Sequence, residues 1–419
     1  MLQKTLPLTM ANYQVLIVGA GVAGLHCALR ISERHPSIKI AIAESYNYVG
    51  GRCYTFKHND TQWESGAGRV HSSHTMTNRY IDAYKLTKIP INSMNDWISE
   101  KGQKEPNTWP ILCKFMVDTL STLNPRLLAS NTISEVMDQV YGKEQAKKFL
   151  NKFAYRSEVT TLRADLALKS FKGEMGAESG FFVIKEGFSE LVHRMRATLE
   201  SRGVEFLFSK RLISVEPHST PILCKFDGPS ISADKVILAI HSEALKKIKP
   251  FTNLPALKHL QMTPLLRTYG VFPTNAKGES WFSGYKTMVT DSPLRHIIPI
   301  NPNKGVIMTS YTDAEDTKPW TKILKTDGEK ALKKSIMTEM KKIFPGVPNP
   351  LFFKSHLWKH GTTYWTPGLY DPVEMGEKIM NPLPSFWQNL YVCGESFSQR
   401  QAWVEGALEN ADMLINKFF

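Results

Sequence analysis

The chain has 419 residues, of which 42% are hydrophobic and 22% are charged. These proportions are typical of a globular protein with a large core, and they exclude disordered, collagen-like and disulfide-scaffold classes. At about 150 residues per domain, the length predicts two to three domains. The net charge of +13 is unusual and raises the question of a nucleic-acid partner.

The positive charge is spread evenly along the chain. Residues 1–210 carry 27 basic and 20 acidic side chains, and the remainder carries 25 and 19. Without a basic arm or stripe, we expect no nucleic-acid partner. The five cysteines form no C-x-x-C pair, so we expect neither a metal site nor a disulfide framework. The longest apolar run (15–25) is too short for a membrane span and no signal peptide is evident, so the sequence predicts a cytoplasmic protein without membrane attachment.

Residues 13–44 have the pattern of one βαβ unit. A short apolar run at 13–18 leads directly into the glycine turn Gly19-x-Gly21-x-x-Gly24. A helical pattern then continues to residue 34, and a β-branched run at 38–43 ends at Glu44. This order of strand, glycine turn, helix, second strand and terminal acid predicts a dinucleotide-binding site.

Each part of this unit has a physical task. Gly19 permits the tight turn, Gly21 lets the backbone approach the pyrophosphate, and Gly24 lets the helix pack closely on the strand. The free N–H groups at the start of the helix face the phosphates. The carboxylate of Glu44 can accept hydrogen bonds from ribose hydroxyls.

A second glycine pair, Gly50-Gly51, precedes Arg52 and adds backbone access and a fixed cation for a diphosphate. The combined pattern resembles the FAD-binding N-terminus of flavin-containing amine oxidases. This family includes monoamine, polyamine and L-amino-acid oxidases and the flavin histone demethylases. The resemblance implies an α/β fold, in which a Rossmann-like FAD-binding domain is interleaved with an α+β substrate domain.

The C-terminal segment supports the same resemblance. A short strand at 389–393 leads to Gly394-Glu395, and Trp403-x-x-Gly-Ala then opens a final helix. In the family, this segment contacts the ribityl chain and the pyrimidine end of the flavin. Ala402 stands where the family usually has a glycine.

The middle of the chain resembles the second FAD-binding block of the family. A helix beginning near residue 186 and strands at 204–208, 211–215 and 235–240 are expected, whereas 85–180 looks mainly helical. In the family, a backbone contact at the position of Leu212 holds the adenine. His241 is expected to be a turn residue.

The resemblance thus implies a discontinuous FAD-binding domain, formed by 11–80, 186–260 and 387–419, and a substrate-binding domain formed by 81–185 and 261–386. No cysteine lies between Cys224 and Cys393, so the covalent tether of monoamine oxidases cannot form and FAD is expected to be non-covalent. The residues implied to bind FAD are Gly19, Gly21, Val22, Ala23, Gly24, Glu44, Ser45, Gly51, Arg52, Gly68, Arg69, Leu212, Glu395, Trp403 and Val404.

Four residues are implied to form the catalytic site: Arg69, Trp403, Trp365 and Tyr364. Trp403 would form one aromatic wall of the substrate cavity, and Tyr364 and Trp365 are candidates for the opposite wall. Arg69 matches the arginine that grips the substrate carboxylate in L-amino-acid oxidases. A clamp on the flavin or a structural ion pair remains an alternative for Arg69. His71 and His74 lie nearby and are more often structural than catalytic in such positions.

The reaction implied is oxidative deamination of a small-molecule amine, with an L-amino acid favoured, by molecular oxygen to an imine and hydrogen peroxide. A polyamine or monoamine oxidase, a flavin desaturase, dehydrogenase or isomerase, and a non-catalytic flavin-fold protein are the alternatives. A homodimer is left open.

One expected group is missing from the sequence. Many members have a lysine that assists reoxidation, and Val271 stands about where that lysine is expected. Lys277 and Lys286 are the nearest lysines downstream. If neither reaches the flavin, we expect either a slow oxidase or a dehydrogenase with another electron acceptor.

Overall fold

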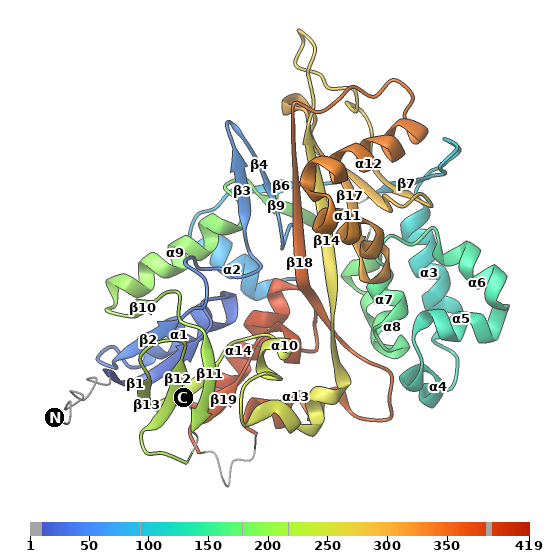
Figure 1. The fold of residues 1–419 in the computed structure, drawn as a ribbon. Coiled ribbons are helices and arrows are strands. Elements are labelled where there is room, and N and C mark those ends of the chain that lie inside the picture. The colour runs from blue at the N-terminus through green and yellow to red at the C-terminus, as the bar shows by residue number, and fades with distance from the viewer. Residues whose placement is uncertain (1–10, 93, 178, 217, 383–387) are drawn as a thin grey trace.

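A computed structural model describes residues 11–419 except 93, 178, 217 and 383–387. Its core is built on two seven-stranded sheets (Figure 1). The strands of the first sheet are, in spatial order, β10 (Glu205–Leu207), β2 (Ile40–Ala43), β1 (Ala11–Val18), β13 (Ile231–Leu238), β12 (Ile222–Phe226) and β11 (Leu212–Glu216), with β19 (Leu390–Val392) also paired to β13.

The first sheet is parallel around its centre. Strands β10, β2, β1, β13 and β19 run in the same direction, whereas β12 and β11 form an antiparallel extension. Short, fully buried strands such as β2 fit this arrangement, because both faces of a parallel sheet are covered by helices.

The second sheet is mostly antiparallel, with β15 and β7 as its parallel pair. Its strands are β18 (Phe352–Trp365), β14 (Leu260–Val271), β17 (Val306–Asp313), β16 (His296–Asn301), β15 (Thr287–Thr290), β7 (Asn95–Ile98) and β8 (Lys104–Glu105). Two smaller sheets consist of β3 (Thr55–His58) with β4 (Thr61–Glu64), and of β5 (Val70–His71), β9 (Phe181–Ile184) and β6 (Lys88–Pro90).

The helices cover these sheets and form a separate helical lobe (Figure 1). They are α1 (Val22–Arg34), α2 (Thr75–Ala83), α3 (Thr108–Leu120), α4 (Pro125–Ser130), α5 (Ile133–Tyr141), α6 (Lys143–Leu150), α7 (Arg156–Thr160), α8 (Ala164–Lys172), α9 (Phe188–Ser201), α10 (Ser242–Leu245), α11 (Lys318–Thr326), α12 (Gly328–Ile343), α13 (Pro372–Met380) and α14 (Val404–Phe418). The predicted βαβ unit and the mainly helical character of 85–180 are therefore confirmed.

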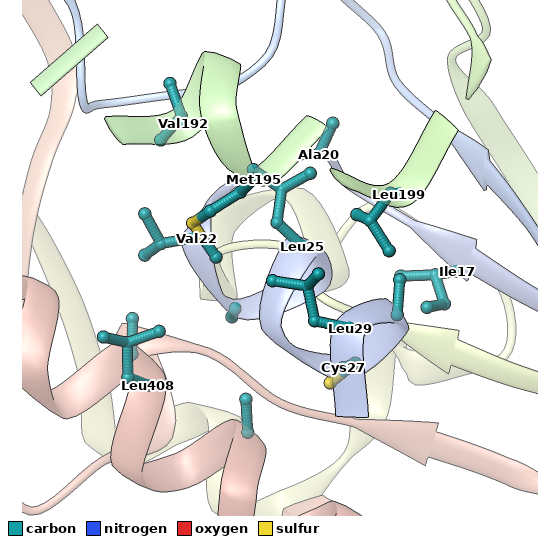
Figure 2. Packing of buried hydrophobic residues seen from close by; sticks show 14 of the residues in the cluster. Ile17, Ala20, Val22, Leu25, Cys27, Leu29, Val192, Met195, Leu199 and Leu408 are labelled. Atoms are coloured by element: carbon teal, nitrogen blue, oxygen red, sulfur yellow. The ribbon is translucent and has the colours of Figure 1, made fainter. Parts of the chain in front are cut away.

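Helix α1 lies at the centre of the hydrophobic core on one face of the first sheet. It is buried along nearly its whole length, because it packs between β1, α9 and α14 (Figure 2). Leu25 is fully buried in this cluster, where Leu→Ala typically costs about 2–5 kcal/mol. This packing fixes where the helix begins and hence where its N–H groups point.

The division into two domains remains a proposal, and the sheets supply its physical basis. The first sheet takes all its strands from the segments expected to bind FAD. The second takes its strands from the other segments, apart from Leu260 at the start of β14. We propose that each sheet marks one domain, with the pairing of β5 and β9 joining them.

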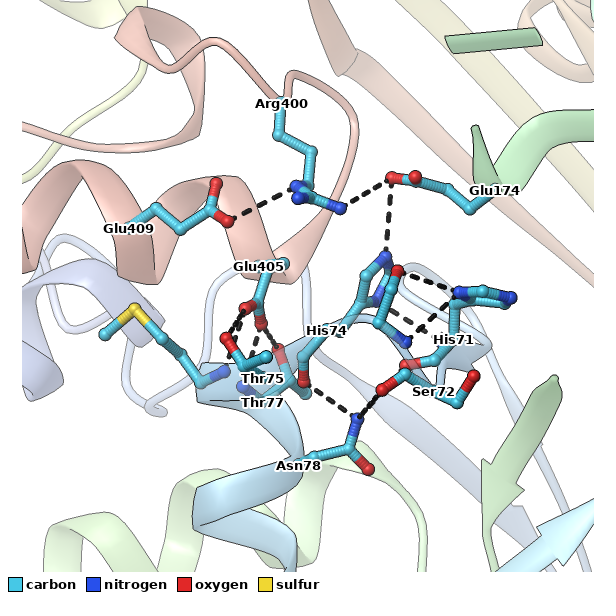
Figure 3. A network of polar contacts seen from close by, with 12 residues as sticks. His71, Ser72, His74, Thr75, Thr77, Asn78, Glu174, Arg400, Glu405 and Glu409 are labelled. Carbon is cyan, nitrogen blue, oxygen red and sulfur yellow. Dashed lines mark hydrogen bonds and ion pairs between the residues drawn. The ribbon is translucent and has the colours of Figure 1, made fainter. Parts of the chain in front are cut away.

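A buried carboxylate ties the last helix to the start of α2 (Figure 3). Glu405 in the first turn of α14 is fully buried and accepts hydrogen bonds from the N–H groups of Met76 and Thr77 at 2.8 Å. It also accepts a bond from the Thr77 hydroxyl at 2.7 Å. A carboxylate on the N-terminal N–H groups of a helix is stabilised by the helix dipole.

We therefore expect Glu405→Gln to destabilise the protein by about 2–3 kcal/mol, because the amide removes the charge and places a donor against N–H groups. Glu409→Gln, one turn further along α14, serves as the matched control because its carboxylate is partly exposed. Thermal melting of both variants measures the effect. Equal melting temperatures for the two variants would contradict this role of Glu405.

Candidate active site

The glycine turn after β1 contains two glycines that the packing requires. Gly19 has φ +109°, and a Cβ at this position would clash with the carbonyl oxygen of Ala239. A Cβ on Gly24 would clash with the carbonyl oxygen of Gly19, because α1 lies directly on the turn. Any side chain at either position would displace the helix from the strand.

Gly21 and Gly51 are different, because they border open space. A Cβ on Gly21 would meet no protein atom within 4 Å, and one on Gly51 would meet only the Cα of Gly21, at 3.9 Å. Gly21 precedes the first helical residue, Val22, and no side chain caps the helix there. Two bare glycines and the start of a helix without a side-chain cap form an open, polar cradle that fits a diphosphate.

The acid at the end of β2 lies beside this cradle. The Oε2 atom of Glu44 accepts a hydrogen bond from the N–H of Ala20 at 2.8 Å, and Oε1 accepts bonds from the Ser45 hydroxyl and the Tyr46 N–H at 2.9 Å. Its orientation is thereby fixed, and Oε2, which accepts only the Ala20 N–H, retains a lone pair for a ribose hydroxyl. Leu212 packs with the strands leading to the turn.

Two of the predicted FAD-binding residues form an ion pair with each other. The Arg52 guanidinium donates to Glu395 and to the carbonyl oxygen of Gly361, both at 2.8 Å. Glu395 also accepts the N–H of Ala402 at 2.7 Å. Ala402 has φ +67°, a left-handed conformation that favours glycine, which explains why the family usually has glycine there.

The segment containing Gly68 is braced by a residue that the sequence reasoning missed. Arg267 on β14 is half-buried, and it donates to the carbonyl oxygens of Glu64, at 3.1 Å, and of Gly66. A Cβ on Gly68 would lie 3.4 Å from its guanidinium. Arg267 is therefore the basic group of this strand that faces the glycine segment.

The structure also places Val271 and the two lysines that follow it. Val271 is the last residue of β14 and packs at the edge of a separate apolar cluster. Lys277 and Lys286 lie on the connection between β14 and β15, and Lys277 is exposed. Because side chains alternate along a strand, Arg267 shares a face with Val271, and Arg267 is the residue of this face that contacts the glycine segment.

Arg69 is surrounded by aromatic rings. Its guanidinium carbon lies 4.4 Å from the ring centre of Phe181, 5.6 Å from that of Trp403 and 5.8 Å from that of Tyr155. Such contacts stabilise the cation without neutralising it. Among the described residues, no carboxylate forms an ion pair with Arg69, so its five N–H donors are available to a ligand.

Trp403 and Val404 lie where α14 begins. Trp403 is the half-buried residue that precedes the helix, and Val404 is its first residue. The Trp403 ring therefore contacts Arg69 while the free N–H groups of the helix lie directly behind it. The structure brings Arg69 and Trp403 together as the sequence predicted.

Tyr364 and Trp365 lie on opposite faces of β18. Tyr364 packs with the helical lobe beside Trp403, and its hydroxyl donates to Glu158 at 3.0 Å. Trp365 is 1% exposed, packs in the core of the first domain and donates its indole N–H to the Ser398 carbonyl at 3.1 Å. This core position does not support the predicted cavity wall at Trp365, because adjacent strand residues cannot face the same side.

A polar network joins His74, Glu174 and Arg400 (Figure 3). The buried ring of His74 meets the Trp403 ring at 4.8 Å, and its Nε2 lies 3.5 Å from Glu174. Burial opposes ionisation of Glu174, but the hydrogen bond with His74 and the charge of Arg400 lower its pKa to about 2. His71 bonds to Ser73 at 2.8 Å. Both histidines therefore have structural partners, and His241 caps α10, as its predicted turn role requires.

Further polar side chains, which the sequence did not reveal, extend the cluster around Arg69. They are Tyr155, Glu158, His296, Tyr311 and Asp313. They come from α7 and its N-cap, β16 and β17, elements that are far apart in sequence. No local pattern marks them, whereas Arg267 could have been found from the alternation along β14.

Comparison with known proteins identifies the family. The sequence model of the flavin containing amine oxidoreductases matches residues 22–412. The chain belongs to this family. Membership confirms the resemblance and FAD as the cofactor, and the glycine cradle fits that cofactor. The protein is therefore an FAD-dependent oxidoreductase of the amine oxidase family.

Individual relatives are distant. Aplysianin-A of Aplysia kurodai is 22% identical over 97% of this chain and 90% of its own length. The L-amino-acid oxidase of Mus musculus is 24% identical over 74% of this chain, which corresponds to 56% of the mouse protein. A variant of putrescine oxidase has a TM-score of 0.77 over 97% of this chain and 98% of its own, at 15% identity, which confirms the predicted α/β fold. Within the described residues, every helix is too short or too polar to span a membrane.

A direct test of the cradle compares Gly21, which borders open space, with Gly24, which packs against backbone. Gly21→Ala is expected to leave the melting temperature of the FAD-free protein unchanged and to weaken FAD binding at least tenfold, because the new methyl group enters the open cradle. Gly24→Ala is expected to destabilise the FAD-free protein itself, because its methyl group meets backbone. Melting and FAD titration measure both effects. Loss of stability in Gly21→Ala with unchanged FAD affinity would contradict the assignment.

Proposed function

We propose that the protein is an FAD-dependent oxidase of L-amino acids, forming the imine and hydrogen peroxide. The observation that carries the proposal is Arg69, a half-buried guanidinium among aromatic rings without an ion-pair partner in the described part of the chain. A planar guanidinium suits a carboxylate, which it can bind through two parallel hydrogen bonds.

Arg69 and its neighbours would hold the substrate in a defined orientation. A carboxylate bound to Arg69 places the α-carbon near Trp403 and the Gly66–Gly68 segment, both of which the family resemblance places at the flavin. The rings of Phe181, Trp403 and Tyr155 would exclude water from the reacting carbon. Bound FAD supplies the two-electron acceptor for the C–H next to the amine.

The charge of Arg69 argues against the polyamine and monoamine alternatives. Such a substrate carries positive charge and no carboxylate, so it would bring an ammonium group toward an uncompensated guanidinium. Like charges in a partly buried site repel each other by more than they do in water. An amino acid avoids this repulsion because its carboxylate lies next to its amine.

A dehydrogenase is the second candidate, and Arg267 favours it. Its guanidinium donates to two backbone carbonyls, so it is less free than a lysine ammonium to hold a water molecule. Separate measurement of anaerobic flavin reduction and of peroxide release distinguishes the two. Fast reduction with slow peroxide release would support the dehydrogenase.

Replacing Arg69 tests the carboxylate contact. We expect Arg69→Ala to lower kcat/KM for a preferred L-amino acid by about 30- to 1000-fold, corresponding to about 2–4 kcal/mol for a lost charge-assisted pair. The rate at which the corresponding amine, which lacks the carboxylate, reduces the flavin should not fall. Arg79→Ala, an exposed arginine on α2, serves as the control. Unchanged kcat/KM for the amino acid in Arg69→Ala would eliminate the proposed contact.

A further inference from the structure

Glu158 is a buried acid with one unused oxygen. Its side chain lies on α7, and Oε1 accepts the Tyr364 hydroxyl at 3.0 Å. Oε2 is buried and has no hydrogen-bond partner among the residues that the structure describes. A buried carboxyl oxygen without a partner costs about 1–3 kcal/mol or more, so such atoms are rare outside ligand sites.

His296 provides a second, independent observation. It opens β16 and is 4% exposed, and neither Nδ1 nor Nε2 has a hydrogen-bond partner. Its ring meets those of Tyr155 and Tyr311 edge-on, at 5.5 and 5.9 Å. Burial and the nearby Arg69, Arg295 and Arg267 lower the pKa of His296 to about 3, so the ring is neutral and can accept one hydrogen bond.

The groups that face Glu158 come from several elements. Asp313 approaches from β17, Tyr364 from β18 and Arg69 from the segment before β5. Burial and the carboxyl of Asp313 raise the pKa of Glu158 to about 8, while Arg69 opposes this. Burial likewise raises the pKa of Asp313 to about 7. The cluster therefore combines the Arg69 cation with two acids, neither of which forms an ion pair within the described residues.

We propose that Glu158, with Asp313 and His296, binds the side-chain ammonium of the substrate, which makes L-lysine or L-ornithine the preferred class of amino acid. The inference rests on the proposed function, because Arg69 would hold the carboxylate of the same molecule. Two of the three N–H donors of an ammonium group match the free Glu158 oxygen and the acceptor nitrogen of the neutral His296 ring.

Binding of such a side chain has a consequence that can be measured. A protonated Glu158 must ionise when an ammonium group is placed beside it, because the pair is stable only as opposite charges. L-Lysine should therefore release up to one proton more than L-norleucine when it binds at pH 7. Norleucine has the same carbon chain and lacks only the ammonium.

The test uses the FAD-loaded protein under anaerobic conditions with three probes. L-Lysine has both charged ends, L-norleucine lacks the ammonium, and cadaverine lacks the carboxylate. We expect L-lysine to reduce the flavin with a kcat/KM at least 30-fold above that of the other two. In Glu158→Gln the ratio of the rates with L-lysine and L-norleucine should fall below threefold. Glu144 is an exposed acid on α6, and Glu144→Gln should retain the full ratio.

The outcomes separate the two proposals. Equal rates with L-lysine and L-norleucine, unchanged by Glu158→Gln, would overturn the side-chain contact and leave the amino-acid oxidase intact. Reduction by cadaverine alone would overturn both proposals. If Glu158→Gln does not fold, calorimetry of the unaltered protein in buffers of different ionisation enthalpy decides the question. Equal proton release with L-lysine and L-norleucine would then overturn the inference.

Discussion

The carboxylate of Glu395 is the contact on which the geometry of the site depends. It accepts hydrogen bonds from four donors: the Arg52 guanidinium, the N–H and hydroxyl of Thr363, and the N–H of Ala402. These donors lie after β2, on β18 and before α14. Because Glu395 is buried and its charge is compensated by Arg52, the three segments are held together firmly.

The positions of the substrate-facing residues follow from this contact. Fixing Ala402 in its left-handed conformation places Trp403 at the start of α14. Fixing Thr363 places Tyr364 on the opposite face of β18 from Thr363, beside Glu158. Arg69 then meets the Trp403 ring, with the acids nearby. The unpaired polar atoms of Glu158 and His296 thus belong to one cluster, as expected for a site built for a polar ligand.

The cofactor half of the molecule was predictable from sequence because its signals are local. Gly19, Gly24 and Glu44 lie within one βαβ unit, and close packing leaves no choice of residue at the two glycines. Leu390–Val392 and the start of α14 were likewise indicated by a compact motif.

The substrate half was predicted only in part, because it is assembled by tertiary contacts. Arg69 and Trp403 were found through their motifs, but Glu158 and His296 have no local signature. Trp365 shows a different limitation. Small errors of register move a side chain to the other face or the far end of a strand, and sequence alone did not fix the register of β14 and β18.

The central claim is that Arg69 receives the carboxylate of the substrate. A crystal structure of the FAD-loaded protein with benzoate, a simple carboxylate, tests it most directly. The account predicts both carboxylate oxygens at about 2.7–2.9 Å from the Arg69 guanidinium, between the rings of Phe181 and Trp403. The claim would be contradicted if the Arg69 guanidinium were bound to FAD or to a protein carboxylate and benzoate were elsewhere or absent.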